Sequence, residues 1–387
     1  MQVIYFDNSA TTRVSSEAAA AAFAAMRENY GNPSSLHGKG LEALRLLNLA
    51  RQTIARVLNA AENEVIFTSG GSEANNMALL GIAQKNRRRA GRVLLTAAEH
   101  PSLLEPAKYV AQTGFDVCYI PVDTQGMVDI EQLGNLLTEQ TIFVGLHHVN
   151  NETGAVQPLA EIGALIRQKA PQAFFHIDGV QGLGKLPLSL KSWQADSCAL
   201  SGHKIHAPKG IGALWLKQGC RLPPLIKGGG QEGDLRSGTE NMSGIAAFAV
   251  AAKKAESSRE KTAAMVLAIK KTLAEELLGI ESSALNGPSL AQAAPHILNI
   301  SFVGAKSEVL LHYLEQQGVC VSAGSACSAK KTAASHVLQA MNLPRERLDS
   351  AIRFSFCGYN TVDEAKKAAV AIRQALTEIR ALSKAKK

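Results

Sequence analysis

The chain has 387 residues, of which 46% are hydrophobic and 19% charged, and its formal net charge is +8. This length is too great for one ordinary domain, and the composition is typical of a globular enzyme with a substantial core, so we expect a large domain and a smaller one. No apolar run approaches the ~18 residues of a membrane span, which excludes an integral membrane protein built from apolar helices.

Six cysteines are scattered without a CxxC pair, which argues against a disulfide framework and favours a reducing cytosol. The alanine-rich stretch 17–26 has no basic leader, so it is interpreted as an amphipathic helix, and we expect a cytoplasmic protein without a targeting segment. Positive charge gathers at residues 85–89 and 384–387. These clusters fit an acidic partner or RNA, or simply a solvated helix end and a chain terminus. Because no aromatic residues interleave with the charges, the second interpretation is favoured and no direct nucleic-acid partner is expected.

Turn-rich loops flank the alanine-rich helix at residues 5–12 and 29–37. Loops held on a rigid scaffold often carry binding groups. The Asn-Pro-Ser-Ser run that begins at Asn32 is equally a sound start signal for the following helix. Apolar residues at helical spacing predict that helix over residues 38–59.

A predicted strand at 64–68 leads through a glycine turn into a helix that ends near residue 84. Strand, turn and helix N-terminus together form an anion site, because free N–H groups and the helix dipole point at the bound charge. Gly71 and Ser72 lie at this point. The same residues also satisfy the plain requirement for a tight turn with a serine cap.

Further short apolar runs predict an alternation of strands and helices typical of a parallel sheet. The strand segments are 92–96, 115–121, 141–147 and 174–177, with helices near 130–137 and 158–169. Ligands of such folds bind at the carboxyl ends of the strands, where His100, Asn151 and Asp178 follow. Asp178, after an apolar strand, is expected to be protonated or paired. The pair His147-His148 does not predict a metal site, because adjacent strand residues point to opposite faces.

A lysine follows the apolar run 197–200 in the sequence Ser201-Gly202-His203-Lys204, and a second apolar run, 213–216, comes after a glycine-punctuated turn. A lysine in this setting suits a Schiff-base nucleophile, since a lysine becomes nucleophilic when desolvation or a nearby cation lowers its pKa. Ser201 and His203 are placed to hold a phosphate, which would fix an aldehyde cofactor against Lys204. The plain alternative is a surface lysine in a loop.

The remainder predicts long helical segments over 242–280 and then a smaller α/β unit. Its strand segments are 296–303 and 351–356, and its helices are 307–316, 335–341 and 361–382. We expect a large domain over residues 1–255, whose segment 1–30 packs with the small domain, and a small domain over 256–387.

One cysteine, Cys327, stands among small residues in the stretch 322–335, whereas a core cysteine would sit among branched apolar residues. Small residues predict a mobile, accessible loop, and Lys330 and Lys331 favour the thiolate. On the strand 351–356, Arg353 is the candidate to bind a substrate carboxylate, because a bidentate Arg–carboxylate pair supplies both charge and orientation. The plain alternative is a surface strand cation.

Three motifs together carry a resemblance to a known family: Asp178-Gly179-Val180-Gln181, Ser201-Gly202-His203-Lys204 and Ser325-Ala326-Cys327. In this order, and over nearly the whole chain, they resemble the group I (NifS/IscS-like) cysteine desulfurases, which depend on pyridoxal 5'-phosphate and belong to aminotransferase class V. The resemblance implies an α/β protein of fold type I, with a mostly parallel seven-stranded sheet flanked by helices and a smaller C-terminal α/β domain.

The resemblance also implies the site residues. The catalytic set is Cys327, Lys204 and His100. The cofactor-binding set is Lys204, Gly71, Ser72, His100, Asn151, Asp178, Gln181, Ser201, His203 and Thr239, with Thr239 given to the neighbouring subunit of a homodimer. The substrate-binding set is Arg353, Asn151 and Asn32. No metal is implied. Asp178 pairs with the pyridine nitrogen, and Gln181 donates to the ring oxygen.

The implied activity converts L-cysteine to L-alanine and leaves a persulfide on Cys327. The sulfur then passes to an acceptor protein for iron–sulfur cluster assembly or tRNA thiolation. Two departures from the family pattern, Thr332-Ala333-Ala334 and Cys357, concern the loop and local packing more than the chemistry. The alternatives left open are a selenocysteine lyase, an aminotransferase of the same fold and a non-catalytic binding module.

Overall fold

The computed structural model describes residues 3–323 and 334–385. Its centre is a seven-stranded sheet in the order β2-β8-β7-β6-β5-β3-β4. Only β8 runs antiparallel to its neighbours. The strands are β2 (Val65–Thr68), β3 (Arg92–Thr96), β4 (Asp116–Ile120), β5 (Thr141–His147), β6 (Phe174–Asp178), β7 (Ser197–Ser201) and β8 (Gly212–Leu216). The predicted mostly parallel seven-stranded sheet is confirmed.

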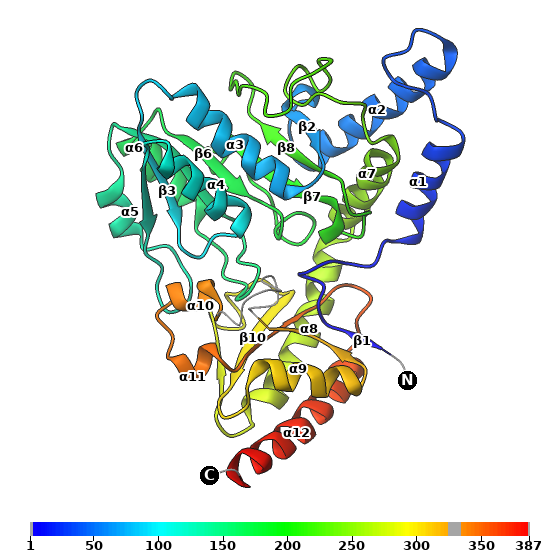
Figure 1. Ribbon diagram of the computed structural model, residues 1–387. Coiled ribbons are helices and arrows are strands. Elements are labelled where there is room, and N and C mark those ends of the chain that lie inside the picture. Colours follow the sequence, from blue (N-terminus) through cyan, green and yellow to red (C-terminus); the bar gives the residue numbers. More distant parts are fainter. Residues whose placement is uncertain (1–2, 324–333, 386–387) are drawn as a thin grey trace.

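Helices cover both faces of this sheet because its strands are apolar on both sides, as parallel strands usually are (Figure 1). Along β3, for example, Leu94 faces one core, while Val93 and Leu95 face the other. One face packs on α3 (Gly71–Lys85) and α4 (Pro101–Gln112). The other packs on α2 (Gly38–Val57), α5 (Ile130–Leu136), α6 (Leu159–Lys169) and α7 (Met242–Ser257).

A second core lies in the C-terminal part, below the large sheet in Figure 1. It is built on a four-stranded antiparallel sheet in the order β12-β13-β10-β9. The strands are β9 (Ser283–Leu285), β10 (Ile297–Phe302), β12 (Ser322–Ala323) and β13 (Ala351–Ser355). The accompanying helices are α8 (Arg259–Leu278), α9 (Ser307–Gln316), α10 (His336–Ala340), α11 (Arg345–Leu348) and α12 (Val362–Ala385).

The N-terminal segment touches both parts. β1 (Ile4–Tyr5) pairs in parallel with β11 (Val319–Cys320), and Phe6 is buried in the C-terminal core. The chain then crosses to the large sheet, where α1 (Ser16–Arg27) packs on α7. Because α7 belongs to one core and α8 to the other, we propose that the two domains divide near Ser258. Among the described residues, no helix has both the length and the apolar character needed to cross a membrane.

Candidate active site

A cavity of ≈ 290 Å³ opens at the carboxyl ends of the central strands. Most of the residues singled out in the sequence line it, although they come from segments far apart in the chain. They are Gly71, Ser72, His100, Asn151, Asp178, Gln181, Ser201, His203, Lys204 and Arg353. The structure therefore brings ten predicted residues together.

One end of the cavity is an anion cradle at the N-terminus of α3. The N-cap residue, Gly70, supplies no side-chain hydrogen bond, so the first N–H groups of the helix remain available. A Cβ on Gly71 would meet Val180 Cγ2 at 2.5 Å, so any larger residue would require Val180 or the first turn of α3 to shift. Burial and then the Lys204 charge lower the pKa of His203 to about 4, so its ring is neutral at pH 7. Free N–H groups beside the Ser201 hydroxyl fit a phosphate group.

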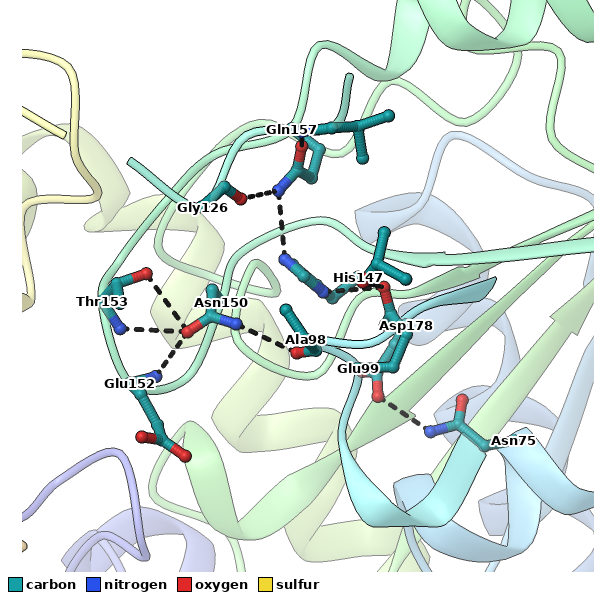
Figure 2. A network of polar contacts seen from close by, with 12 residues as sticks. Asn75, Ala98, Glu99, Gly126, His147, Asn150, Glu152, Thr153, Gln157 and Asp178 are labelled. Atoms are coloured by element: carbon teal, nitrogen blue, oxygen red, sulfur yellow. Dashed lines mark hydrogen bonds and ion pairs between the residues drawn. The ribbon is translucent and has the colours of Figure 1, made fainter. Parts of the chain in front are cut away.

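The cavity wall also contains a fixed negative group, the carboxylate of Asp178 at the end of β6. Its Oδ2 accepts a hydrogen bond from Asn75 Nδ2 at 2.8 Å, and its Oδ1 accepts one from Val180 N at 3.0 Å. Asn75 is held in turn by His176 Nε2, 2.8 Å from its Oδ1. Figure 2 shows Asn75 turned toward Asp178. A buried carboxylate fixed in this way fits the protonated nitrogen of a pyridine ring.

Lys204 ends a short 3-10 turn, η2 (Gly202–Lys204), directly after β7. Its Nζ donates to the carbonyl oxygens of Ser9 and Ala10. Thr12 anchors this crossing segment, because both its N–H and its hydroxyl donate to His203 O at 3.0 Å. The N-terminal loop therefore holds the Lys204 amine at the cavity wall.

His100 is the N-cap of α4, and its Nδ1 accepts a hydrogen bond from Ser102 N at 3.2 Å. Burial lowers the pKa of His100, although the nearby Asp178 carboxylate opposes this shift. The ring is therefore neutral at pH 7. Since Nδ1 is an acceptor, the proton is assigned to Nε2. A neutral imidazole in the cavity wall can give and take a proton.

Arg353 approaches the cavity from β13 of the C-terminal sheet. It is 5% exposed, so the alternative of a surface cation is wrong. Its Nη2 donates to Asp7 Oδ1 at 2.7 Å and its Nη1 to Asn151 O at 3.0 Å. Among the described residues, its buried Nε has no partner. Arg353 lines the cavity, and a guanidinium at this place fits a substrate carboxylate.

Three predicted residues do not line this cavity. Asn32 is exposed, and its side chain caps its own loop by accepting from Ser34 N at 2.9 Å. Thr239 is also exposed, on the segment that joins β8 to α7. Cys327 lies outside the described residues, as do Lys330, Lys331 and the Thr332-Ala333 part of the departure noted above.

The structure adds residues that the sequence reasoning missed. Asn75 fixes Asp178, and Ser102 contacts both Asn75 and His100 at 2.8 Å. Lys185 Nζ donates to Gln181 Oε1 at 2.9 Å, and Gln181 Nε2 donates to Ser9 O at 3.0 Å. The sequence offers only a spacing for these residues, since Asn75 follows Gly71 by one helical turn and Lys185 follows Gln181 by four residues, and this spacing does not show what they contact.

A buried contact between Glu99 and His147 lies next to these groups, because His147 lines the same cavity. Glu99 Oε1 lies 2.9 Å from His147 Nδ1, and Gln157 contacts the other ring nitrogen at 3.2 Å (Figure 2). Burial lowers the pKa of His147, but Glu99 outweighs it and the net pKa is raised. His147 and His148 diverge as expected, since His148 packs on Trp193 with ring centroids 4.7 Å apart.

Comparison with known proteins agrees with this geometry. Residues 4–367 match the family model described as aminotransferase class-V. The chain is 37% identical to the cysteine desulfurase IscS of Methanosarcina thermophila, over 99% of this chain and 94% of that protein. A solved structure described as a NifS-like protein superposes with a TM-score of 0.92 at 35% identity, covering 97% of this chain and 100% of that one. The structure of SspA in complex with cysteine superposes with a TM-score of 0.81 at 31% identity, covering 92% of this chain and 100% of that one.

The fold and the cavity define a pyridoxal-phosphate enzyme of fold type I. The chain belongs to the class-V aminotransferase family and, within it, to the cysteine desulfurases.

Proposed function

We propose that this protein desulfurates L-cysteine, with Lys204, His100, Asp178 and Arg353 as working groups of one cavity and Cys327 as the sulfur acceptor. The observation that carries the proposal is the convergence of the first four groups around a single cavity next to an anion cradle. Family membership supports the activity, and the cavity supports the residue roles.

Each group has a role that follows from its position. Bound pyridoxal phosphate supplies an electron sink for the pair released at the substrate Cα. Asp178 would pair with the ring nitrogen, and the α3 N-terminus would hold the phosphate. The Lys204 amine carries the Cα proton, and the Arg353 guanidinium orients the substrate carboxylate. His100, neutral and protonated on Nε2, handles the proton of the substrate thiol.

The sulfur step is written as an exchange between two thiols. The Cys327 thiolate attacks the substrate sulfur, an S–S bond forms, and the substrate C–S bond breaks. The C–S electron pair stays on carbon, which takes up a proton, so cysteine becomes alanine and Cys327 becomes a persulfide. No outside oxidant is required. A thiol of an acceptor protein, for iron–sulfur cluster assembly or tRNA thiolation, then takes the sulfur by exchange.

We also propose a homodimer in which Thr239 contacts the phosphate in the partner subunit's cavity. Its exposed position, away from its own cavity, supports this assignment. Asn32, which is likewise exposed and away from this cavity, is proposed to act near the substrate. A reducing cytoplasm is proposed because the five cysteines among the described residues are all free thiols.

The test is to measure alanine and sulfide from L-cysteine with the purified, cofactor-loaded protein, and to detect the persulfide by mass spectrometry. We expect Cys327→Ser to lose the persulfide and cysteine turnover while keeping the visible absorbance of the bound cofactor. Cys118→Ser, on the edge strand β4, is the matched control and should behave as the native protein. Full turnover by Cys327→Ser would contradict the sulfur role of Cys327, and survival of selenocysteine lysis alone would favour the lyase.

A further inference from the structure

A second cavity, of ≈ 200 Å³, shares Lys204 with the first. It lies where the two cores meet, because its walls come from the N-terminal loop, from the α7–α8 junction and from the turn after β13. No step of the proposed reaction uses this space. Its lining shows what it is built to hold.

The walls of this second cavity are mostly apolar. Ile205, Ala255, Ala263, Val266 and Phe356 contribute to them. Among the described residues, no aspartate or glutamate lines the cavity. An apolar body is therefore accommodated, whereas a cationic group finds no counter-charge.

Two of the lining cations are already paired outside the cavity. Lys254 is bound to Glu17, and Arg259 Nε lies 3.1 Å from Glu256 Oε1. Neither glutamate lines the cavity. Because Lys254 and Arg259 are already paired with these glutamates, the deeper lining groups decide which charge the interior of the cavity can bind.

Lys185 is the cation of the interior that has donors to spare. Within the described chain, its one hydrogen bond goes to Gln181 Oε1, whereas an ammonium offers three donors. Burial and then the neighbouring Lys204 charge lower the pKa of Lys185 to about 7. An anion beside Lys185 would offset both effects and stabilise its charged form.

His296 is the second group with unmet hydrogen-bonding capacity. It is 3% exposed, and in the described part of the chain neither ring nitrogen has a partner. Burial, followed by the charge of nearby Lys185, holds its pKa well below the usual value, so the ring is neutral with one N–H donor. Cys357 adds no charge, because burial raises the pKa of its thiol. A buried imidazole with two orphan nitrogens needs an explanation, and a ligand supplies one.

We propose that the second cavity binds a small monocarboxylate that has an apolar body and carries no ammonium group. Its carboxylate accepts hydrogen bonds from Lys185 and from the His296 N–H. Its body packs on the alanine, valine and phenylalanine walls. L-Cysteine and L-alanine are excluded, because their ammonium group would be buried without a carboxylate partner. The site is thus distinct in chemistry from the substrate site.

The proposed site is linked to Lys204 by a chain of hydrogen bonds. Lys185 donates to Gln181, Gln181 donates to Ser9 O, and the same carbonyl oxygen accepts from Lys204 Nζ. A carboxylate that stabilises the charged form of Lys185 would bind at one end of this hydrogen-bonded chain, and Lys204 stands at the other end. The site therefore joins both cores and the reactive lysine.

The experiment is a calorimetric titration of the cofactor-loaded protein with benzoate at about pH 6, where Lys185 holds its proton. We expect saturable binding that L-alanine does not displace. Ala263→Phe fills the cavity and should weaken binding by roughly tenfold or more. Ala264→Phe, on the exposed neighbouring position of α8, is the matched control and should bind as the native protein does.

Lys185→Met and His296→Phe provide a second arm, since each removes one proposed donor and should also weaken benzoate binding by roughly tenfold. Thermal melts of all four variants check that they are folded. Absence of saturable benzoate binding, or equal affinity in Ala263→Phe and Ala264→Phe, would overturn the proposal. Cysteine turnover is measured in parallel, so a failure of the desulfurase mechanism and a failure of this site are separate results.

Discussion

The two cavities that share Lys204 differ chiefly in their carboxylates. The first holds Asp178, fixed by Asn75, at one side and the α3 N-terminus at the other, so it can bind a positive ring nitrogen and a phosphate together. The second has no carboxylate among its described lining residues. Both contain a lysine and histidines. The comparison teaches that the counter-charges around a lysine, more than the lysine itself, decide what the surrounding space can bind.

Removing the charge of Asp178 removes this difference between the two cavities, and we expect it to have the largest effect on cysteine turnover. Asp178→Asn keeps the shape of the side chain but cannot pair with a positive ring nitrogen as a carboxylate does. We expect kcat for cysteine turnover to fall by about 10²- to 10³-fold, the usual loss when one fixed electrostatic partner of a transition state is removed.

The control for this substitution is Asp363→Asn, in the first turn of α12 and outside both cavities. Steady-state kinetics with saturating cofactor, together with melting curves, separate a chemical defect from an unfolded protein. If folded Asp178→Asn retained half of the native kcat, the proposed pairing of Asp178 with the ring nitrogen would be wrong.

How much of the fold could be predicted from the sequence depends on how many residues each apolar run contains. The large sheet was predictable because its strands are mostly apolar segments of four to seven residues. β1, β9, β11 and β12 were not, since strands of two or three residues carry no periodicity. Their pairing is decided by tertiary contacts such as the burial of Phe6 in the C-terminal core.

The site shows the same division. Asp178 and Lys204 stand out because polar residues after apolar strands demand a reason. Asn75 does not, because its role arises from a contact with Asp178 across 103 residues of sequence. Lys185 likewise looks like a loop lysine until burial and Gln181 are seen together. Roles that depend on long-range packing could not be predicted from local sequence.

The anion cradle gives the next test, with an intermediate effect. Gly71→Ala places a Cβ 2.5 Å from Val180 Cγ2, so either Val180 or the first turn of α3 must shift. Overpacking usually costs about 1–3 kcal/mol of folding stability, and because the N–H groups of this turn are displaced we expect the affinity for pyridoxal phosphate to weaken by roughly tenfold. Absorbance titration of the cofactor-depleted protein measures this affinity.

Gly38→Ala is the matched substitution, because a Cβ at the start of α2 meets nothing within 4 Å. It should leave cofactor affinity at the native value. If Gly71→Ala also kept the native affinity for pyridoxal phosphate, binding of the phosphate would not depend on the close approach of the α3 backbone to Val180.

We expect the smallest effect on turnover from substitution of Lys185, because this residue contacts the first cavity only through Gln181. Its substitution should instead change how the stability of the protein depends on pH. Its pKa is lowered to about 7 in the folded protein, against about 10.4 for an exposed lysine. Between these pH values the unfolded chain holds a proton that the folded protein releases, so native stability rises with pH. Lys185→Met removes this dependence. It should stabilise the protein by about 1–3 kcal/mol at pH 7, with the gain shrinking toward about pH 10.

Urea unfolding at both ends of this pH range measures the difference, and Lys253→Met, an exposed lysine of α7, serves as the comparison. We expect Lys253→Met to change stability little, and equally at both pH values. A gain in Lys185→Met that does not shrink with pH would mean that Lys185 keeps its proton in the folded protein.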